Sequence, residues 1–217
     1  MGIDYNNIIV SDGLVFYIDA ANPRSYSGTG LTTNGLVGGI GATLINGVGF
    51  TSSNNGLFSF DGSNDYINFA NSSTVQQSSG TLSVWVRASS PGAFYRGIVA
   101  KQGAYGLFFL NGVLIAYDWT ADLARTTEID IADNTWKNVA LTYQSGVNNG
   151  TQIYLNGISV MTTTITVLNQ INNLFGGAEA NASQFAACQI SSFNMYSRAL
   201  TAQEVLQNYN ATKGRFR

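Results

Sequence analysis

The chain has 217 residues, of which 45% are hydrophobic and 12% aromatic, so it can bury a substantial core as one domain. Ten basic and twelve acidic residues give a net charge of −2, and no dense run of Lys or Arg occurs, which argues against a nucleic-acid partner. The chain contains no histidine and a single cysteine, which excludes an intrachain disulfide together with Ser-His, Cys-His and zinc-histidine chemistry, and we expect no cofactor.

The N-terminus "MGIDYNNIIVSDG" shows no basic segment followed by an apolar one, and no apolar run approaches the ~18 residues of a membrane span. We expect a protein made in the cytoplasm without an export signal and with no membrane partner. Residues 1–12 are assigned to an N-terminal segment or first edge strand, and residues 13–217 to one domain. Because "YNNIIV" is apolar, residues 1–10 are expected to dock on a neighbouring subunit or to place residues 8–10 in the first strand.

Short apolar runs separated by turn residues recur along the chain. The 24 glycines, two prolines and a charged fraction of only 10% favour many short strands joined by tight turns. Residues 27–50 show no such pattern and are expected to form a long loop. The other runs predict consecutive strands of a sandwich: "GLVFYID", "LFSF", "DYINF", "TLSVWVRA", "GIVAK", "YGLFFL", "VLIAY", "WKNVALTY", "TQIYL", "ISVMTTT" and "CQISSFNMY".

Three local signals are more specific. Asn111-Gly112 and Asn156-Gly157 each separate two apolar runs, and Asn-Gly is the dipeptide that a type I′ turn favours, so two antiparallel hairpins are predicted. Thr201 and Glu204 in "LTAQEVLQNYN" have the spacing of a capping box and predict one short helix near residues 201–210. The tail "KGRFR" is expected to be a solvated end, with a docking peptide as the alternative.

The order of these segments resembles the concanavalin A-like, laminin G-like jelly rolls from about Gly13 to the C-terminus. The resemblance implies an all-β fold, a two-sheet antiparallel jelly-roll sandwich with one short C-terminal helix. The segments that carry it are "GLVFYIDAANPRSY", "FSFDGSNDYINF", "GTLSVWVRA", "NTWKNVALTYQSG", "TQIYLNGISV" and "CQISSFNMYSRALTAQEVLQNYNATKGRF".

The two ends carry a narrower resemblance. "GLVFYIDAANPRSYSG" and "NYNATKGRF" are similar to modules in virion proteins of tailed phages, notably those of marine cyanobacteria. This similarity implies a structural or adhesive virion module, in capsid decoration or in a tail fibre. Its partners would be other virion proteins, identical subunits in a homo-oligomer, and cell-surface or exopolysaccharide glycans.

The acidic run "EIDIAD" contains Glu128, Asp130 and Asp133. It is similar to the Glu-x-Asp-x-x-Glu motif of laminarinase-type glycoside hydrolases, but the third residue is the shorter Asp, and a retaining mechanism needs its carboxyl groups about 5–5.5 Å apart. "ADNTW" is also similar to the turn that laminin G-like domains place before the next strand. The run is therefore interpreted as a solvent-facing strand edge and turn, and a β-glucanase is the least favoured function.

The segment "FDGSNDYI" places Asp61 and Asp65 on either side of a turn. A calcium-loop pattern fails because Tyr66 and Ser72 stand where the loop needs glycine and a bidentate glutamate. Some laminin G-like relatives hold a calcium ion at the rim, which leaves Asp61 and Asp65 open as ligands. A hairpin turn is favoured, and no metal site is predicted.

Aromatic side chains are the candidates for binding a ligand. Tyr105, Tyr117 and Trp119 lie around the predicted Asn111-Gly112 hairpin, and Trp119 precedes a predicted loop where its ring could be exposed. Trp85 and Trp136 lie in strongly patterned strands and are expected in the core. A stand-alone carbohydrate-binding module is therefore the alternative to a virion module.

Overall fold

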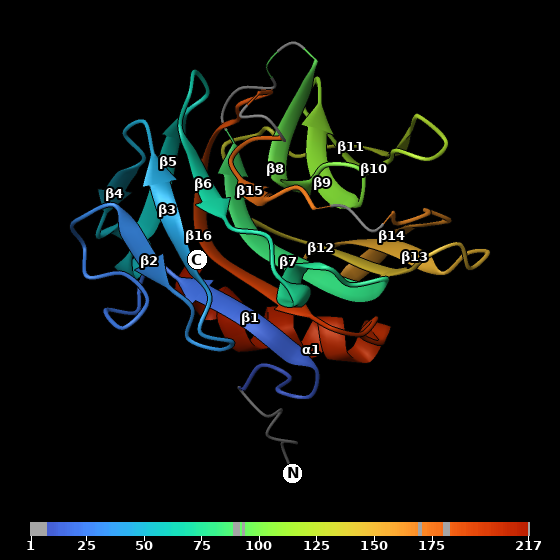
Figure 1. Ribbon diagram of the computed structural model, residues 1–217, viewed down its shortest axis with the longest axis horizontal. Helices are drawn as coiled ribbons and strands as arrows, with labels where there is room; N and C mark the ends of the chain where they lie inside the picture. The colour runs from blue at the N-terminus through green and yellow to red at the C-terminus, as the bar shows by residue number, and fades with distance from the viewer. Residues whose placement is uncertain (1–7, 89–91, 93, 169–170, 180–182, 217) are drawn as a thin grey trace.

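The computed structural model describes residues 8–88, 92, 94–168, 171–179 and 183–216. Two antiparallel sheets face each other, and a short helix near the C-terminus lies beneath one of them (Figure 1). The strands are β1 (Leu14–Asp19), β2 (Thr32–Asn34), β3 (Gly41–Ile45), β4 (Gly49–Thr51), β5 (Leu57–Asp61), β6 (Tyr66–Phe69), β7 (Ser79–Ala88), β8 (Tyr95–Lys101), β9 (Tyr105–Leu110), β10 (Val113–Asp118), β11 (Leu123–Asp130), β12 (Lys137–Gln144), β13 (Thr151–Leu155), β14 (Ile158–Thr163), β15 (Leu174–Gly176) and β16 (Ala187–Tyr196). The helices are the α-helix α1 (Ala202–Thr212) and the 3₁₀ helices η1 (Ser53–Asn55), η2 (Ser73–Val75) and η3 (Lys213–Phe216).

The strand order confirms the predicted two-sheet jelly roll. One sheet, sheet A, runs β14-β13-β12-β7-β16-β5-β4, with β1 also paired to β16. The other, sheet B, runs β11-β10-β9-β8-β15-β6-β3-β2. Both Asn-Gly hairpins form as predicted, since Asn111, Gly112, Asn156 and Gly157 all adopt the positive φ that a type I′ turn requires.

The core lies between the two sheets and is rich in aromatic rings. Alternate residues of each strand point inward, as the period of two in a strand requires. Phe16 and Phe193 of sheet A pack against Phe69 of sheet B, with ring centroids 5.1 and 5.8 Å from that of Phe69. Tyr105 of β9 stacks on Tyr143 of β12 at 5.1 Å in the same way. Aromatic contacts across the gap therefore join the sheets.

Residues 27–50, expected to be a long loop, contain three short strands. β2 and β3 extend sheet B beyond β6, and β4 pairs with β5 in sheet A. Only Ala42 and Leu44 are buried in β3, alternating with exposed neighbours. Two apolar residues are too few to give a recognisable strand pattern in the sequence, so the expectation was wrong here.

The outer face of sheet A is covered by the C-terminal helix and tail. Thr201 and Glu204 form the predicted capping box at the start of α1. Trp85, which is buried on this face and not between the sheets, stacks on Tyr209 of α1 and on Phe216 of η3, with centroids 5.8 and 4.1 Å apart. Trp136 is only half-buried and lies 4.8 Å from Phe216. Its expected place in the core was wrong.

The tail also differs from the expectation of a solvated end. The Arg215 guanidinium pairs with Asp19 at 2.6 Å and donates hydrogen bonds to the carbonyl oxygens of Asn54 and Gly56. The described part of "KGRFR" is therefore docked on its own domain. No helix within the described ranges has the length and apolar character to cross a membrane.

The described part of the N-terminal segment is attached to α1. The Val10 backbone N–H donates to Asn208 Oδ1 at 2.8 Å, and the Tyr196 hydroxyl donates to the Val10 carbonyl oxygen at 3.0 Å. Ile8, Ile9 and Val10 form no strand, so the first-strand expectation for them was wrong, and the first strand is β1. Residues 1–7, part of the expected docking arm, lie outside the described residues.

Glu204→Gln is expected to reduce stability at neutral pH and to have little effect near pH 2. Hydrogen bonds from Arg198 and Thr201 lower the pKa of Glu204 to about 2. Between that value and the unfolded pKa of about 4.3 the unfolded chain binds more protons, so the stabilisation is present above this window and lost as pH falls through it. We expect a loss of about 1 kcal/mol at pH 7 by urea unfolding. Glu128→Gln, at an exposed site, is the control, and an equal loss at both pH values would contradict the assignment.

Candidate functional site

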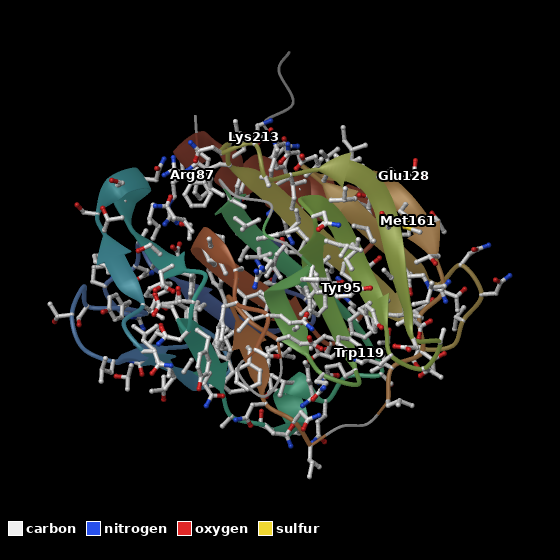
Figure 2. The ribbon with its side chains drawn as sticks, turned by 90° about the horizontal axis from the view of Figure 1, so that it is seen from above. Arg87, Tyr95, Trp119, Glu128, Met161 and Lys213 are labelled. Carbon is white, nitrogen blue, oxygen red and sulfur yellow. The ribbon has the colours of Figure 1, made fainter. Side chains whose placement is uncertain are left out.

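The outer face of sheet B carries a hollow with aromatic walls. Its volume is about 190 Å³, and it lies over β8, β9 and β10. In Figure 2, Tyr95 and Trp119 lie near each other above these strands. The residues that line it are Tyr95, Phe108, Tyr117, Trp119, Asp122, Glu179 and Gln184.

The register of the first Asn-Gly hairpin places the rings on one face. The two-residue turn pairs Leu110 with Val113, and the ladder then pairs Phe108 with Ile115. Residues paired across two strands point to the same side, and so do residues two apart along one strand. Tyr117, two residues beyond Ile115, therefore shares the outer face with Phe108.

The rings meet at steep angles and form walls instead of a flat stack. Tyr95 and Tyr117 are 5.4 Å apart at 86°, and Tyr117 and Trp119 are 5.2 Å apart at 66°. Phe108, which is buried, lies 5.9 Å from Trp119 and forms the floor. Tyr95, Tyr117 and Trp119 remain half-buried, so part of each ring is accessible.

The segment after β15 forms the polar side of the hollow. It crosses the outer face of β8, where the Gly97 backbone N–H donates to the Gln184 carbonyl oxygen at 2.9 Å. A Cβ atom at Gly97 would lie 2.3 Å from the carbonyl carbon of Ala178. Glycine is therefore required for the close approach that brings Glu179 and Gln184 to the aromatic rings.

Hydrogen bonds within the hollow fix its polar groups. The Tyr117 hydroxyl donates to Asp122 Oδ1 at 2.5 Å, and this bond raises the pKa of Tyr117 to about 12. Burial raises the pKa of Glu179, while a hydrogen bond from the Trp119 side chain acts in the opposite direction. The side-chain oxygen of Gln184 is buried and has no hydrogen-bond partner among the described residues. The hollow thus presents acceptor groups beside accessible rings.

The structure brings together two of the three aromatic residues that the sequence singled out. Trp119 and Tyr117 line the hollow, but Tyr105 is fully buried in the core and donates its hydroxyl to the Val75 carbonyl oxygen at 2.7 Å. The prediction that Tyr105 stacks on a ligand was therefore wrong. The reason is strand alternation, which places Tyr105 on the side of Leu107 and Phe109 and opposite to Phe108.

Sequence reasoning missed the remaining residues of the hollow. Counting across the Asn-Gly turn could have found Phe108, since it pairs with Ile115. Asp122 lies in the turn that follows Trp119, and no sequence pattern marked it as a binding residue. Glu179 and Gln184 reach the hollow only through pairing with β8, far from them in sequence, and no local pattern indicates that contact.

A larger hollow, of about 270 Å³, includes Lys101, at the opposite end of β8 from Tyr95. Lys101 is almost fully buried, and burial lowers its pKa to about 8. Its ammonium group donates to Asn71 Oδ1 at 2.8 Å and to the Asn172 carbonyl oxygen. Among the described residues of its lining, the one aromatic ring is that of Tyr105, which is buried in the core, so these residues offer no accessible ring.

The acidic run lies on an edge strand and turn, which confirms the interpretation made from the sequence. Glu128 has φ of 61° at a bulge of β11, and it lies far from Trp119 in Figure 2. Asp130 accepts a hydrogen bond from the Ala132 backbone at 2.8 Å. Asp133 pairs with Lys137 at 2.8 Å, and this contact lowers the pKa of Asp133 to about 2. The Asp130 and Asp133 carboxylates bind nearby backbone or side-chain groups, Glu128 is exposed, and none of the three lines a described hollow.

Asp61 and Asp65 stabilise a turn, although not a hairpin. Asp61 Oδ1 accepts from the Ser63 backbone at 2.7 Å, which lowers the pKa of Asp61, and Asp65 accepts from the Asp61 backbone at 3.2 Å. The turn joins β5 of sheet A to β6 of sheet B, so the expected hairpin is corrected to a connection between sheets. Within the described ranges, no three His, Cys, Asp or Glu side chains gather as a metal site would require.

A sequence model of the concanavalin A-like lectin/glucanases superfamily matches residues 61–206, more than half of the chain. The chain belongs to this superfamily. A search of curated proteins gives no sequence match.

Solved structures show the same fold at low sequence identity. The binding domain of Paraclostridial Mosquitocidal Protein 1 has a TM-score of 0.70 and 16% identity over 91% of this chain and 52% of that one. The botulinum neurotoxin serotype D binding domain gives 0.67 and 16% over 91% and 51%. Trypanosoma rangeli sialidase in complex with sialic acid gives 0.68 and 14% over 91% and 32%. The chain spans about half the length of the two toxin domains and about a third of the sialidase.

Gly97→Ala is expected to displace the 177–179 segment and to disrupt the hollow while the sandwich stays folded. The added methyl group would collide with the Ala178 backbone, which cannot move away as a flexible side chain would. We expect the melting temperature to fall by several degrees, as about 1–2 kcal/mol of overpacking implies. Trp119 fluorescence should change as its contact with Glu179 is lost. Gly214→Ala is the control, because that glycine, like Gly97, has no positive φ and an added Cβ would meet no atom within 4 Å.

An unchanged Trp119 emission in Gly97→Ala would show that this glycine does not position the segment. Trp85 and Trp136 also emit, so the measurement is made in a Trp85→Phe, Trp136→Phe background that is first shown to fold by circular dichroism.

Proposed function

We propose that this chain is a non-enzymatic, glycan-binding adhesive module and that it works as part of a virion. The observation that supports glycan binding is the hollow on sheet B, where Tyr95, Tyr117 and Trp119 present half-buried rings beside Asp122 and Glu179. Apolar faces of sugars pack on aromatic rings, while sugar hydroxyls donate to acceptors of this kind. A concave, partly apolar site with a few convergent polar groups is the usual form of a small-ligand site.

Membership of a superfamily of lectins and glucanases is consistent with this proposal, although fold does not fix function. Two of the similar structures are titled as binding domains of toxins, and a third is a sialidase with sialic acid bound. The acidic run lies on the edge strand β11 and the turn after it and contributes nothing to the hollow, which favours binding over hydrolysis.

The virion role rests on the two ends of the chain, which are similar to modules of tailed-phage virion proteins. In this role the chain would decorate a capsid or form part of a tail or fibre, and its partners would be identical subunits and other virion proteins. Repeated contacts between identical subunits are the usual basis of such assemblies. Light scattering on the purified chain and antibody labelling of particles in electron micrographs test it. A monomer that labels no particle would refute the virion role and leave glycan binding to be judged separately.

Trp119→Ala is expected to reduce binding to any glycan recognised on an array by about tenfold or more, because it removes one stacking wall. Ile158→Ala, an exposed apolar residue on β14 in the other sheet, is the matched control and should bind as the wild type does. Absence of binding to every glycan on the array would refute the proposed function.

Release of reducing sugars from a bound glycan would refute the non-enzymatic assignment. Glu128→Gln and Glu179→Gln then identify which carboxylate carries the reaction. Retention of that activity in both variants would exclude both residues.

A further inference from the structure

We infer that the hollow on sheet B selects sugars that carry a free, protonated amino group. This inference rests on the proposed glycan-binding function and specifies its ligand class. Its basis is the combination, in one small site, of two carboxylates and three accessible aromatic rings, with no compensating cation among the described lining residues.

The carboxylates of the hollow have no positive partner. None of the described residues that line it is Lys or Arg, and no ion pair within the described ranges involves Asp122 or Glu179. Arg125 lies on β11 and pairs with Ala116 of β10, whose side chain is buried in the core. Residues paired across strands share a side, so Arg125 projects away from the hollow, and its guanidinium forms an ion pair with Asp118. A partly buried carboxylate without a countercharge is costly to desolvate, and a cationic ligand would offset that cost.

Arg96 also lies on a strand of the hollow but faces away from it. It pairs with Phe109, whose side chain is buried in the core, whereas Tyr95 pairs with Leu110. Residues paired across strands share a side, so Arg96 projects opposite to Tyr95. Neither arginine near the site therefore neutralises Asp122 or Glu179.

The hydrogen-bonding groups left for a ligand are mainly acceptors. The Tyr117 hydroxyl already donates to Asp122, and the Trp119 side chain donates to Glu179. What remains are the carboxylate oxygens of Asp122 and Glu179 and the Tyr95 hydroxyl, which can donate or accept. An ammonium group has three donors and no acceptor, so it matches this set. The carbonyl oxygen of an acetamido group would instead gain nothing from the two carboxylates, which cannot donate to it.

The rings add attraction for the same group. The Tyr95 and Tyr117 rings stand at 86° to each other, and the Tyr117 and Trp119 rings at 66°. The three rings therefore border the site from more than one side. A cation near such faces is attracted by the ring quadrupole. The volume of about 190 Å³ is below the ~300–1,000 Å³ of sites for drug-sized ligands and suits one sugar unit or its substituent.

The same charges argue against acidic sugars. A uronic or sialic acid would bring a third carboxylate beside Asp122 and Glu179, and like charges at short range repel. The order of affinity that follows is amino sugar first, neutral or N-acetylated sugar next, and acidic sugar last.

Titration calorimetry of the full chain with a β-1,4-linked glucosamine tetramer and with its fully N-acetylated counterpart tests the inference. We expect the amine to bind about tenfold more tightly or better, and the preference to shrink at 1 M salt through screening. Glu179→Gln, which keeps the shape and can still accept from Trp119, should abolish the preference without weakening the N-acetylated ligand. Asp122→Asn, at an exposed position, should reduce the preference without risk to the core.

Glu128→Gln removes a carboxylate from β11 outside the hollow and should leave the preference intact. Equal affinity for the two tetramers, or a preference unchanged in both Glu179→Gln and Asp122→Asn, would overturn the amino-sugar inference. The glycan-binding function would still stand if either tetramer or another array glycan binds. Absence of binding to all of them would overturn both.

Discussion

The pairing of β16 in the middle of sheet A is the interaction on which the rest of the fold depends. One flank of β16 pairs with β7 along most of its length, while the other pairs first with β5, through residues 187–190, and then with β1, through residues 192–196. The register against β7 shifts between Ile190 and Phe193, which accommodates the change of partner. A strand near the C-terminus thus holds the first strand, the middle of the chain and the helix that follows it in one unit.

This arrangement makes the two outer faces of the sandwich unequal. β16 leads directly into α1 and η3, which cover the outer face of sheet A by packing Tyr209 and Phe216 on Trp85. Arg215 then fastens the tail to Asp19 at the end of β1. In the described part of the chain no helix covers sheet B, so its outward rings are left accessible, and the candidate site forms there. The location of the site is therefore a consequence of which sheet the C-terminal segment covers.

The chemistry of the hollow depends on a backbone approach more than on any single side chain. Without a Cβ at position 97, the segment that follows β15 can lie against β8 and place Glu179 beside Trp119. The aromatic hairpin alone would be an apolar patch. The added Glu179 carboxylate and the nearby Asp122 give it polarity and charge, which is what distinguishes a ligand site from ordinary exposed surface.

The sequence by itself determined the features that are encoded locally. Asn-Gly marks a turn because both of its residues tolerate the positive φ that the turn needs. Thr201 and Glu204 mark a helix start because their side chains accept hydrogen bonds from free backbone N–H groups there. Alternating apolar runs specify strands. Interpreting Asp133 as a turn residue also needed only its neighbours. Tertiary structure alone decided that "FDGSNDYI" crosses between sheets, that β2 to β4 form, and that Glu179 meets Trp119. These outcomes depend on pairings between segments distant in the chain, whose free energy comes from burial and hydrogen bonds that no local window of sequence contains.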